Sequence, residues 1–255
     1  MIIKVLGASG SELPGQNSPC FLLDNHTTLD AGTISNVLNE EDQYKINDIF
    51  LTHSHLDHIK AIPFISENIA ISNTPHNINI YSIAPVLKLI KDNMLNNFIW
   101  PDFTVIPNIQ NSIIKLIDLT IEKPIIIKDF SITPLLVNHA IPAVGYLIKT
   151  DDNKRIFYTG DTGPNDTIWD KIGQIPLDCL IIEVSFPDKL EELSIISGHL
   201  TPKLLNIELS KIKYPPKHIY ITHIKQQYHA LIKSELDDLM IDNLNILHDG
   251  YIIEV

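Results

Sequence analysis

The chain has 255 residues, 44% of them hydrophobic, and its 19 basic and 31 acidic residues give a formal net charge of −12. This apolar content excludes a disordered acidic chain, and the charge argues against broad capture of nucleic acid, which needs a basic face. Two cysteines, Cys20 and Cys179, exclude a disulfide framework and a cysteine-rich zinc module. Every apolar run is shorter than the roughly 20 residues of a membrane span, so we expect a cytoplasmic protein without a membrane partner.

Short β-branched runs bounded by Gly, Asn, Asp and Pro predict strands. In chain order these runs cover residues 2–6, 20–24, 27–30, 49–51, 79–82, 131–137, 145–149, 155–159, 177–183, 219–222 and 251–254. Helical spacing predicts helices over residues 59–68, 85–98, 201–212 and 229–240. We therefore expect one α/β domain over residues 1–255, with sheets packed between helices. The segment 85–119 reads as an insertion whose helix forms a cap.

A cluster of metal-ligating residue types, His53-Ser54-His55-Leu56-Asp57-His58, follows the apolar run 49–51. At the end of a strand, residues i and i+2 point the same way, so His53 and His55 can share one metal ion. Asp57 and His58 fall where the chain turns into a helix and are aimed elsewhere. One short loop can therefore serve two neighbouring ions. Imidazole and carboxylate ligands suit zinc and its first-row neighbours.

Two metal ions need more donors than this loop supplies. Three further candidates come after predicted strands, namely His139, Asp161 and His223. Each is weak by itself, because a single histidine near a strand end is more often a structural or surface residue. Their joint placement is what favours a shared site, since residues at the carboxyl ends of strands can converge on one edge of a sheet stack.

Taken together, these residues resemble the metallo-β-lactamase superfamily. The resemblance covers essentially the whole chain and rests on Leu29-Asp30-Ala31-Gly32, the motif 53–58, His139, Gly160-Asp161 and His223, in the family's order. It implies an αββα sandwich, in which two mostly antiparallel or mixed sheets pack face to face with helices outside. It also implies two divalent cations, with Zn²⁺ as the first choice and Mn²⁺ or iron as alternatives. The implied ligands are His53, His55 and His139 for the first ion, Asp57, His58 and His223 for the second, and Asp161 as the bridge.

Two finer segments are similar to class II 3′,5′-cyclic-nucleotide phosphodiesterases, with ribonuclease Z as the nearest relative. One is Ser197-Gly-His-Leu-Thr-Pro and the other is Ile221-Thr-His-Ile-Lys. His199 in the first segment lies just before a helix N-cap, where we expect it to be exposed at a turn and able to protonate a substrate. The ribonuclease resemblance implies that Glu183 lies near His199 and could hold it in its protonated state.

The reaction that this resemblance implies is hydrolysis of a 3′,5′-cyclic nucleotide, cyclic AMP or cyclic GMP, to the nucleoside 5′-monophosphate. A metal-bridging hydroxide is the expected nucleophile, and His199 would donate a proton to the departing 3′ oxygen. Asp57, His199 and Glu183 are the predicted catalytic residues. Arg155, the one arginine, is remote from the motifs, so the metals must supply most of the phosphate binding, helped by His199 and Lys225.

Several alternatives stay open at this point. A ribonuclease Z-like or other phosphodiester hydrolase is the first, although the stretch 139–161, where that family carries its tRNA-gripping arm, is short here and holds two predicted strands. This length and the net charge of −12 favour a small nucleotide over tRNA. Thioesterase or lactamase chemistry and a non-catalytic metal-binding scaffold are further alternatives. The sequence also leaves the base and the oligomeric state open, a homodimer being one option.

Overall fold

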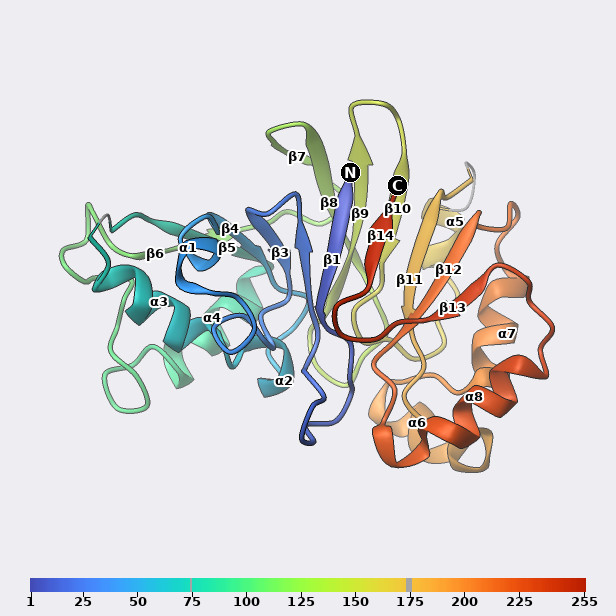
Figure 1. The fold of residues 1–255 in the computed structure, drawn as a ribbon. Coiled ribbons are helices and arrows are strands. Elements are labelled where there is room, and N and C mark those ends of the chain that lie inside the picture. Colours follow the sequence, from blue (N-terminus) through green and yellow to red (C-terminus); the bar gives the residue numbers. More distant parts are fainter. Residues whose placement is uncertain (74, 173–175) are drawn as a thin grey trace.

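The structure of the chain is a computed structural model that describes residues 1–73, 75–172 and 176–255. Its strands form two seven-stranded sheets that pack face to face, with helices on both outer sides (Figure 1). This architecture is the αββα sandwich, so the predicted fold class is confirmed. Each helix within the described ranges is too short or too polar to cross a bilayer.

The first sheet has the strand order β14-β1-β2-β3-β4-β5-β6. Strands β3 to β6 run parallel, whereas β14, β1 and β2 pair in antiparallel fashion, as does β2 with β3. The bounds are β1 (Ile2–Gly7), β2 (Cys20–Leu23), β3 (Thr27–Leu29), β4 (Asp48–Phe50), β5 (Ile78–Ser82), β6 (Ile114–Asp118) and β14 (Ile252–Glu254). The helices of this half are α1 (Glu40–Gln43), α2 (Leu56–Ile59), α3 (Ile62–Ala70) and α4 (Ala84–Asn93).

The second sheet has the order β13-β12-β11-β10-β9-β8-β7. Its strands are β7 (Ile125–Ile127), β8 (Phe130–Leu136), β9 (Val144–Thr150), β10 (Arg155–Tyr158), β11 (Cys179–Glu183), β12 (His218–Thr222) and β13 (Leu244–Ile246). The helices α5 (Ile168–Ile172), α6 (Glu191–Ser197), α7 (Pro202–Ser210) and α8 (His229–Asp237) cover this half. Because β9 is antiparallel to both β8 and β10, and β10 to β13 run parallel, the carboxyl ends of β8, β10, β11 and β12 meet at one edge.

Aromatic side chains fill the space between the two sheets. Phe21 of the first sheet packs on Tyr158 of the second with ring centroids 4.9 Å apart, and Phe50 meets Tyr146 edge to face at 5.5 Å. All four side chains are fully buried, and burying one large apolar side chain stabilises a fold by roughly 1.5–3 kcal/mol. This layer holds the strand ends of the two sheets in a fixed relation to each other.

The structure differs from the predicted elements mainly in the segment 85–119. Its first part is helical, as predicted, but its last part is β6, the edge strand of the first sheet. Parallel pairing of β6 with β5 is a long-range interaction that a local pattern does not specify. The short strands β7 and β13 and the helices α5 and α6 were likewise absent from the prediction. The proposed capping role of the segment stays a prediction.

Candidate metal centre

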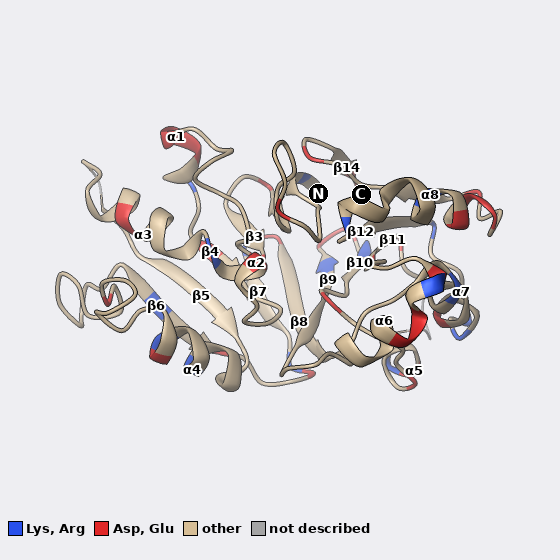
Figure 2. Ribbon diagram, turned by 90° about the horizontal axis from the view of Figure 1, so that it is seen from below, with Lys and Arg blue, Asp and Glu red and all other residues tan. Residues whose placement is uncertain are grey.

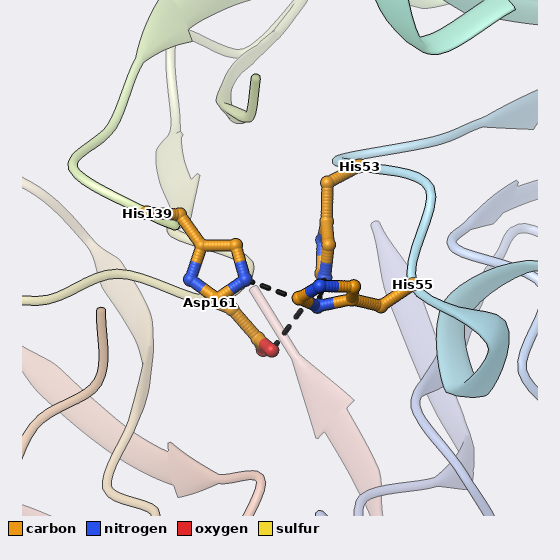
Figure 3. A group of neighbouring side chains, drawn as sticks. All are labelled: His53, His55, His139 and Asp161. Atoms are coloured by element: carbon orange, nitrogen blue, oxygen red, sulfur yellow. Dashed lines mark hydrogen bonds and ion pairs between the residues drawn. The ribbon is translucent and has the colours of Figure 1, made fainter. Parts of the chain in front are cut away.

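Four predicted ligands come together at the edge where β4, β8 and β10 end. His53 and His55 follow β4, His139 follows β8 and Asp161 follows β10. Figure 3 shows the three imidazoles and the carboxylate pointing toward one another, with His53 and His55 on one side and His139 and Asp161 on the other. The His55 Nδ1 atom lies 3.1 Å from His53 Nε2 and 3.1 Å from His139 Nε2, and His53 Nε2 lies 3.6 Å from Asp161 Oδ2.

A second cluster adjoins the first and contains Asp57, His58 and His223. His223 Nε2 lies 3.2 Å from Asp57 Oδ2 and 3.4 Å from His58 Nε2. The carboxylate of Asp161 reaches both histidines, at 3.3 Å from His58 Nε2 and 3.4 Å from His223 Nε2. Asp161 thus lies between the two clusters, in the position that a bridging ligand requires.

The donor atoms of both clusters fit divalent cations in number, type and spacing. Ligands about 2.0–2.2 Å from a tetrahedral metal ion are themselves roughly 3.3–3.6 Å apart, close to the donor separations in both clusters. Burial lowers the pKa of His53 well below its ordinary value, and it also lowers the pKa values of His55 and His139. Neutral imidazole is the form that binds a metal. The number, type and spacing of the donors are therefore compatible with two ions, and the lowered pKa values favour metal binding at the first cluster. Nitrogen and oxygen ligands suit zinc and its neighbours.

His199 lies beside this centre and is held by Glu183, which ends β11. Its Nδ1 donates to Glu183 Oε1 at 2.6 Å, and Glu183 is fully buried. The expected exposure of His199 is wrong, because only 7% of the residue is accessible. The rings of Phe186, His139 and His223 surround it, with centroids 5.2–5.7 Å away. Burial lowers the pKa of His199, but the neighbouring carboxylates, Glu183 first and then Asp161, together raise that pKa above its ordinary value.

Ser185, which the predicted site does not include, links Glu183 to the second cluster. Its Oγ donates to Glu183 Oε2 at 2.8 Å and lies 2.8 Å from His223 Nδ1. A hydrogen bond at the second nitrogen of a ligating histidine fixes the orientation of its ring. Ser185 stands in the segment Glu183-Val-Ser-Phe, where a polar residue two positions after the end of an apolar strand is the available signal.

Asp30 is a second buried residue that the predicted site omitted. Its carboxylate accepts hydrogen bonds from Thr52 and from Tyr158, and its Oδ2 lies 2.8 Å from His58 Nδ1. Thr52 Oγ1 in turn lies 3.0 Å from His53 Nδ1. Asp30 therefore orients a histidine of each cluster. Burial lowers the pKa of His58, yet Asp161 and Asp30 together raise it well above its ordinary value.

The backbone around His223 is shaped for a close approach of the loop after β1. His223 has φ of 63°, and its amide donates to Ala8 O at 2.7 Å. A Cβ atom at Gly10 would lie 2.2 Å from His223 O, so only glycine fits there. Lys225, a predicted substrate contact, is half-buried and donates from Nζ to Gly10 O at 2.5 Å. Its ammonium is thus engaged with the same loop.

The comparisons with known proteins identify the family of this chain. A sequence profile described as "Beta-lactamase superfamily domain" matches residues 29–224, a span that contains all seven candidate ligands. The chain therefore belongs to the metallo-β-lactamase superfamily. It is 28% identical over 222 residues to a Yersinia pestis protein named "Probable 3′,5′-cyclic-nucleotide phosphodiesterase". The aligned region covers 75% of this chain and 62% of the relative.

Other relatives carry a second name. Over 105 residues, 41% of this chain and 32% of the relative, the chain is 29% identical to a protein named "Ribonuclease Z" from Methanococcus maripaludis. The chain thus spans less than two thirds of the length of these curated relatives. Among solved structures, unliganded yeast PDE1 superposes with a TM-score of 0.84 at 19% identity, covering 100% of this chain and 99% of the other. The short form of human tRNase Z gives 0.72 at 19% identity with the same coverage, and both matches show the shared fold.

Proposed function

We propose that this chain is a metal-dependent phosphodiesterase that hydrolyses a 3′,5′-cyclic nucleotide to the nucleoside 5′-monophosphate. His53, His55, His139 and Asp161 would hold one divalent ion, and Asp57, His58, His223 and Asp161 the other. When bound, such ions lower the pKa of water and polarise phosphoryl oxygens. The observation that carries the proposal is the 2.6 Å hydrogen bond between buried Glu183 and His199, directly beside both clusters.

In this proposal His199 is the proton donor to the leaving group. Opening the cyclic phosphate breaks the bond from phosphorus to the 3′ oxygen, which leaves as a basic alkoxide unless it is protonated. Glu183 occupies His199 Nδ1, so Nε2 is the nitrogen that can donate the proton. Because Glu183 raises the pKa of this imidazole, the protonated form is favoured before the reaction.

Two observations support a small nucleotide over tRNA as the substrate. The residues between His139 and Asp161 form strands β9 and β10, joined by a turn at residues 151–154. The expectation of two strands in this stretch is thus confirmed, and a long arm has no room there. Figure 2 shows basic and acidic residues interspersed on α4 and α8, whereas polyanion binding uses a basic stripe.

Ribonuclease Z-like hydrolysis is the second candidate, favoured by the curated relatives that carry this name. The test is to load the protein with Zn²⁺ or Mn²⁺ and to incubate it with cyclic AMP, cyclic GMP, a chromogenic phosphodiester and a precursor tRNA. Release of nucleoside 5′-monophosphate supports the proposal. Cleavage of the tRNA without turnover of cyclic nucleotides favours the second candidate, and nucleotide binding without turnover points to a non-catalytic scaffold.

The proton-donor role is tested by replacing His199 with Ala. We expect turnover of cyclic nucleotides to fall about 10²–10⁴-fold, with the metal content unchanged by elemental analysis. His218→Ala is the matched control, because His218 is exposed at the start of β12 and its loss should leave turnover intact. Full activity of His199→Ala would remove this residue from the mechanism.

A further inference from the structure

An apolar pocket opens beside the metal-binding loop, between α2 and α4. Ser54 and Leu56 line one side of it and are the chain neighbours of the ligand His55, and Ile59 follows the ligand His58. Leu89 and Asn93 of α4 and Ile99 from the loop after α4 line the other side. The pocket has a volume of about 310 Å³. We call it the α2–α4 pocket.

The lining of the α2–α4 pocket is uncharged; Ile59 and Met94 form its buried part, and three further apolar side chains are exposed. Leu56 is 65% exposed, Leu89 40% and Ile99 68%. Apolar groups gathered at one exposed place commonly mark a binding site. Asn93 adds a side-chain amide, whose Nδ2 donates to Leu89 O at 3.0 Å. An occupant of this pocket should therefore be largely apolar and uncharged, with polar atoms at its edge.

A different pocket, about 390 Å³ in volume, is lined in part by the residues that directly follow α2, and it differs from the first in having charged side chains in its wall. Lys60 and Glu12 line it and form an ion pair with the Nζ and Oε2 atoms 2.5 Å apart. Phe64 also lines it. An uncharged planar group in this pocket would displace water from the charged Lys60 and Glu12 side chains without replacing their hydrogen bonds to water, which is unfavourable. The α2–α4 pocket carries no such cost.

We infer that the α2–α4 pocket receives the base of the cyclic nucleotide while its phosphate lies at the metal centre. This inference rests on the proposed function. In a cyclic nucleotide only the ribose separates the phosphate from the base, and in this chain the pocket wall and the ligand His55 are adjacent residues. The faces of the base would contact Leu56, Leu89 and Ile99, and the amide of Asn93 would face its polar edge. A volume of about 310 Å³ lies near the lower end of the roughly 300–1,000 Å³ that is typical of ligand sites.

The test compares cyclic AMP with ribose 3′,5′-cyclic phosphate that lacks a base, in metal-loaded protein. The measured quantity is kcat/KM for cyclic AMP divided by kcat/KM for the compound without a base. We expect this ratio to fall by about 10- to 100-fold in Ile99→Glu and in Leu89→Glu, since contacts in an apolar pocket discriminate to that extent. Ile71→Glu is the matched control for Ile99→Glu, because Ile71 is 77% exposed and also lies outside regular helices and strands. This control should leave the ratio unchanged. Asn93→Ala should change the preference between cyclic AMP and cyclic GMP.

The outcomes separate this inference from the proposed function. If the unaltered protein hydrolyses neither compound, the proposed function fails and the inference fails with it. If it hydrolyses cyclic AMP but the ratio is the same in both pocket variants, the proposed function stands and the base-binding inference is overturned. A fall of the ratio in Phe64→Ala, with none in the pocket variants, would place the base in the pocket of Lys60 and Glu12. Loss of a dimer in Ile99→Glu by light scattering, at an unchanged ratio, would identify the surface as a contact between copies.

Discussion

The two halves of the sandwich contribute to the candidate metal centre in different ways. The first half supplies four candidate ligands from one short stretch, residues 53–58, which comprises the loop after β4 and the first turn of α2. The second sheet supplies His139, Asp161 and His223 from the ends of three different strands, β8, β10 and β12. One contiguous stretch of chain thus faces a set of residues that only the second sheet brings together.

The residues that orient the candidate ligands also differ between the two halves. In the first half one carboxylate, Asp30, orients His58 directly and His53 through Thr52. In the second half Ser185 contacts both His223 and Glu183, and Glu183 holds His199. The carboxylate of the first half therefore orients only candidate metal ligands, whereas the polar side chains of the second half also hold the proposed proton donor. Substitutions in the two halves should have different consequences.

The largest effect is expected where the two halves meet, at Asp161. In Asp161→Ala both clusters lose a donor, so we expect bound metal to fall from two ions per chain to one or none. Turnover should fall by at least about 10⁴-fold. Elemental analysis and a cyclic nucleotide assay measure the two quantities. The control is Asp166→Ala, since the Asp166 side chain is 93% exposed. Retention of both ions in Asp161→Ala would contradict the bridging position.

A smaller effect, confined to the second half, is expected for Glu183→Gln. Loss of the carboxylate removes the interaction that raises the pKa of His199. The active, protonated form is present below that pKa and is lost as the pH rises through it, so the alkaline limb of kcat/KM should move to lower pH. At pH 8 we expect a loss of about 10²-fold.

A pH profile with the metal content measured in parallel separates this effect from general damage. Glu208→Gln is the matched control, because Glu208 is also buried in the second half but accepts from Trp169 and Lys211, away from the centre. Its substitution should lower stability and leave the limb in place. An unmoved limb in Glu183→Gln would contradict the role given to this residue.

The contrast between the halves also explains how much the sequence could predict. The loop 53–58 was recognisable because four donors stand within six residues, and the spacing of His53 and His55 follows from strand geometry. His139, Asp161 and His223 were individually weak, and only their order within a known family joined them. The structure brings all seven candidate ligands together.

The parts that the sequence did not reveal depend on long-range contacts. Asp30 reaches Tyr158 across the sandwich, 128 residues away in the chain. The burial of His199 depends on rings from three other segments, so a position before a helix N-cap could not predict it. Edge strand β6 likewise depends on its pairing with β5. Local patterns carry little information about such contacts.

In the first half, Asp30→Asn should weaken metal binding about 10- to 100-fold, the usual result of altering a residue that orients a ligand. The neutral amide is a poorer partner for His58 Nδ1 than the carboxylate is. Competition with a chelator measures the affinity. Tyr158→Phe removes a hydrogen bond to the same carboxylate and should lower stability by about 0.5–1.5 kcal/mol, without changing the affinity. Equal affinities of Asp30→Asn and the unaltered protein would show that Asp30 only stabilises the fold.

The smallest effect compares one helix cap from each half. Thr201 caps α7 by accepting from the Leu204 amide, and it lies two residues after His199. Asn39 caps α1 by accepting from the Asp42 amide. Each replacement by Ala should lower the free energy of unfolding by about 1 kcal/mol, because one amide at the helix start loses its partner. Urea denaturation measures both changes. Only Thr201→Ala should also lower kcat, by a few-fold, because its cap fixes the loop that carries His199. An unchanged kcat in Thr201→Ala would show that the loop keeps its conformation without the cap.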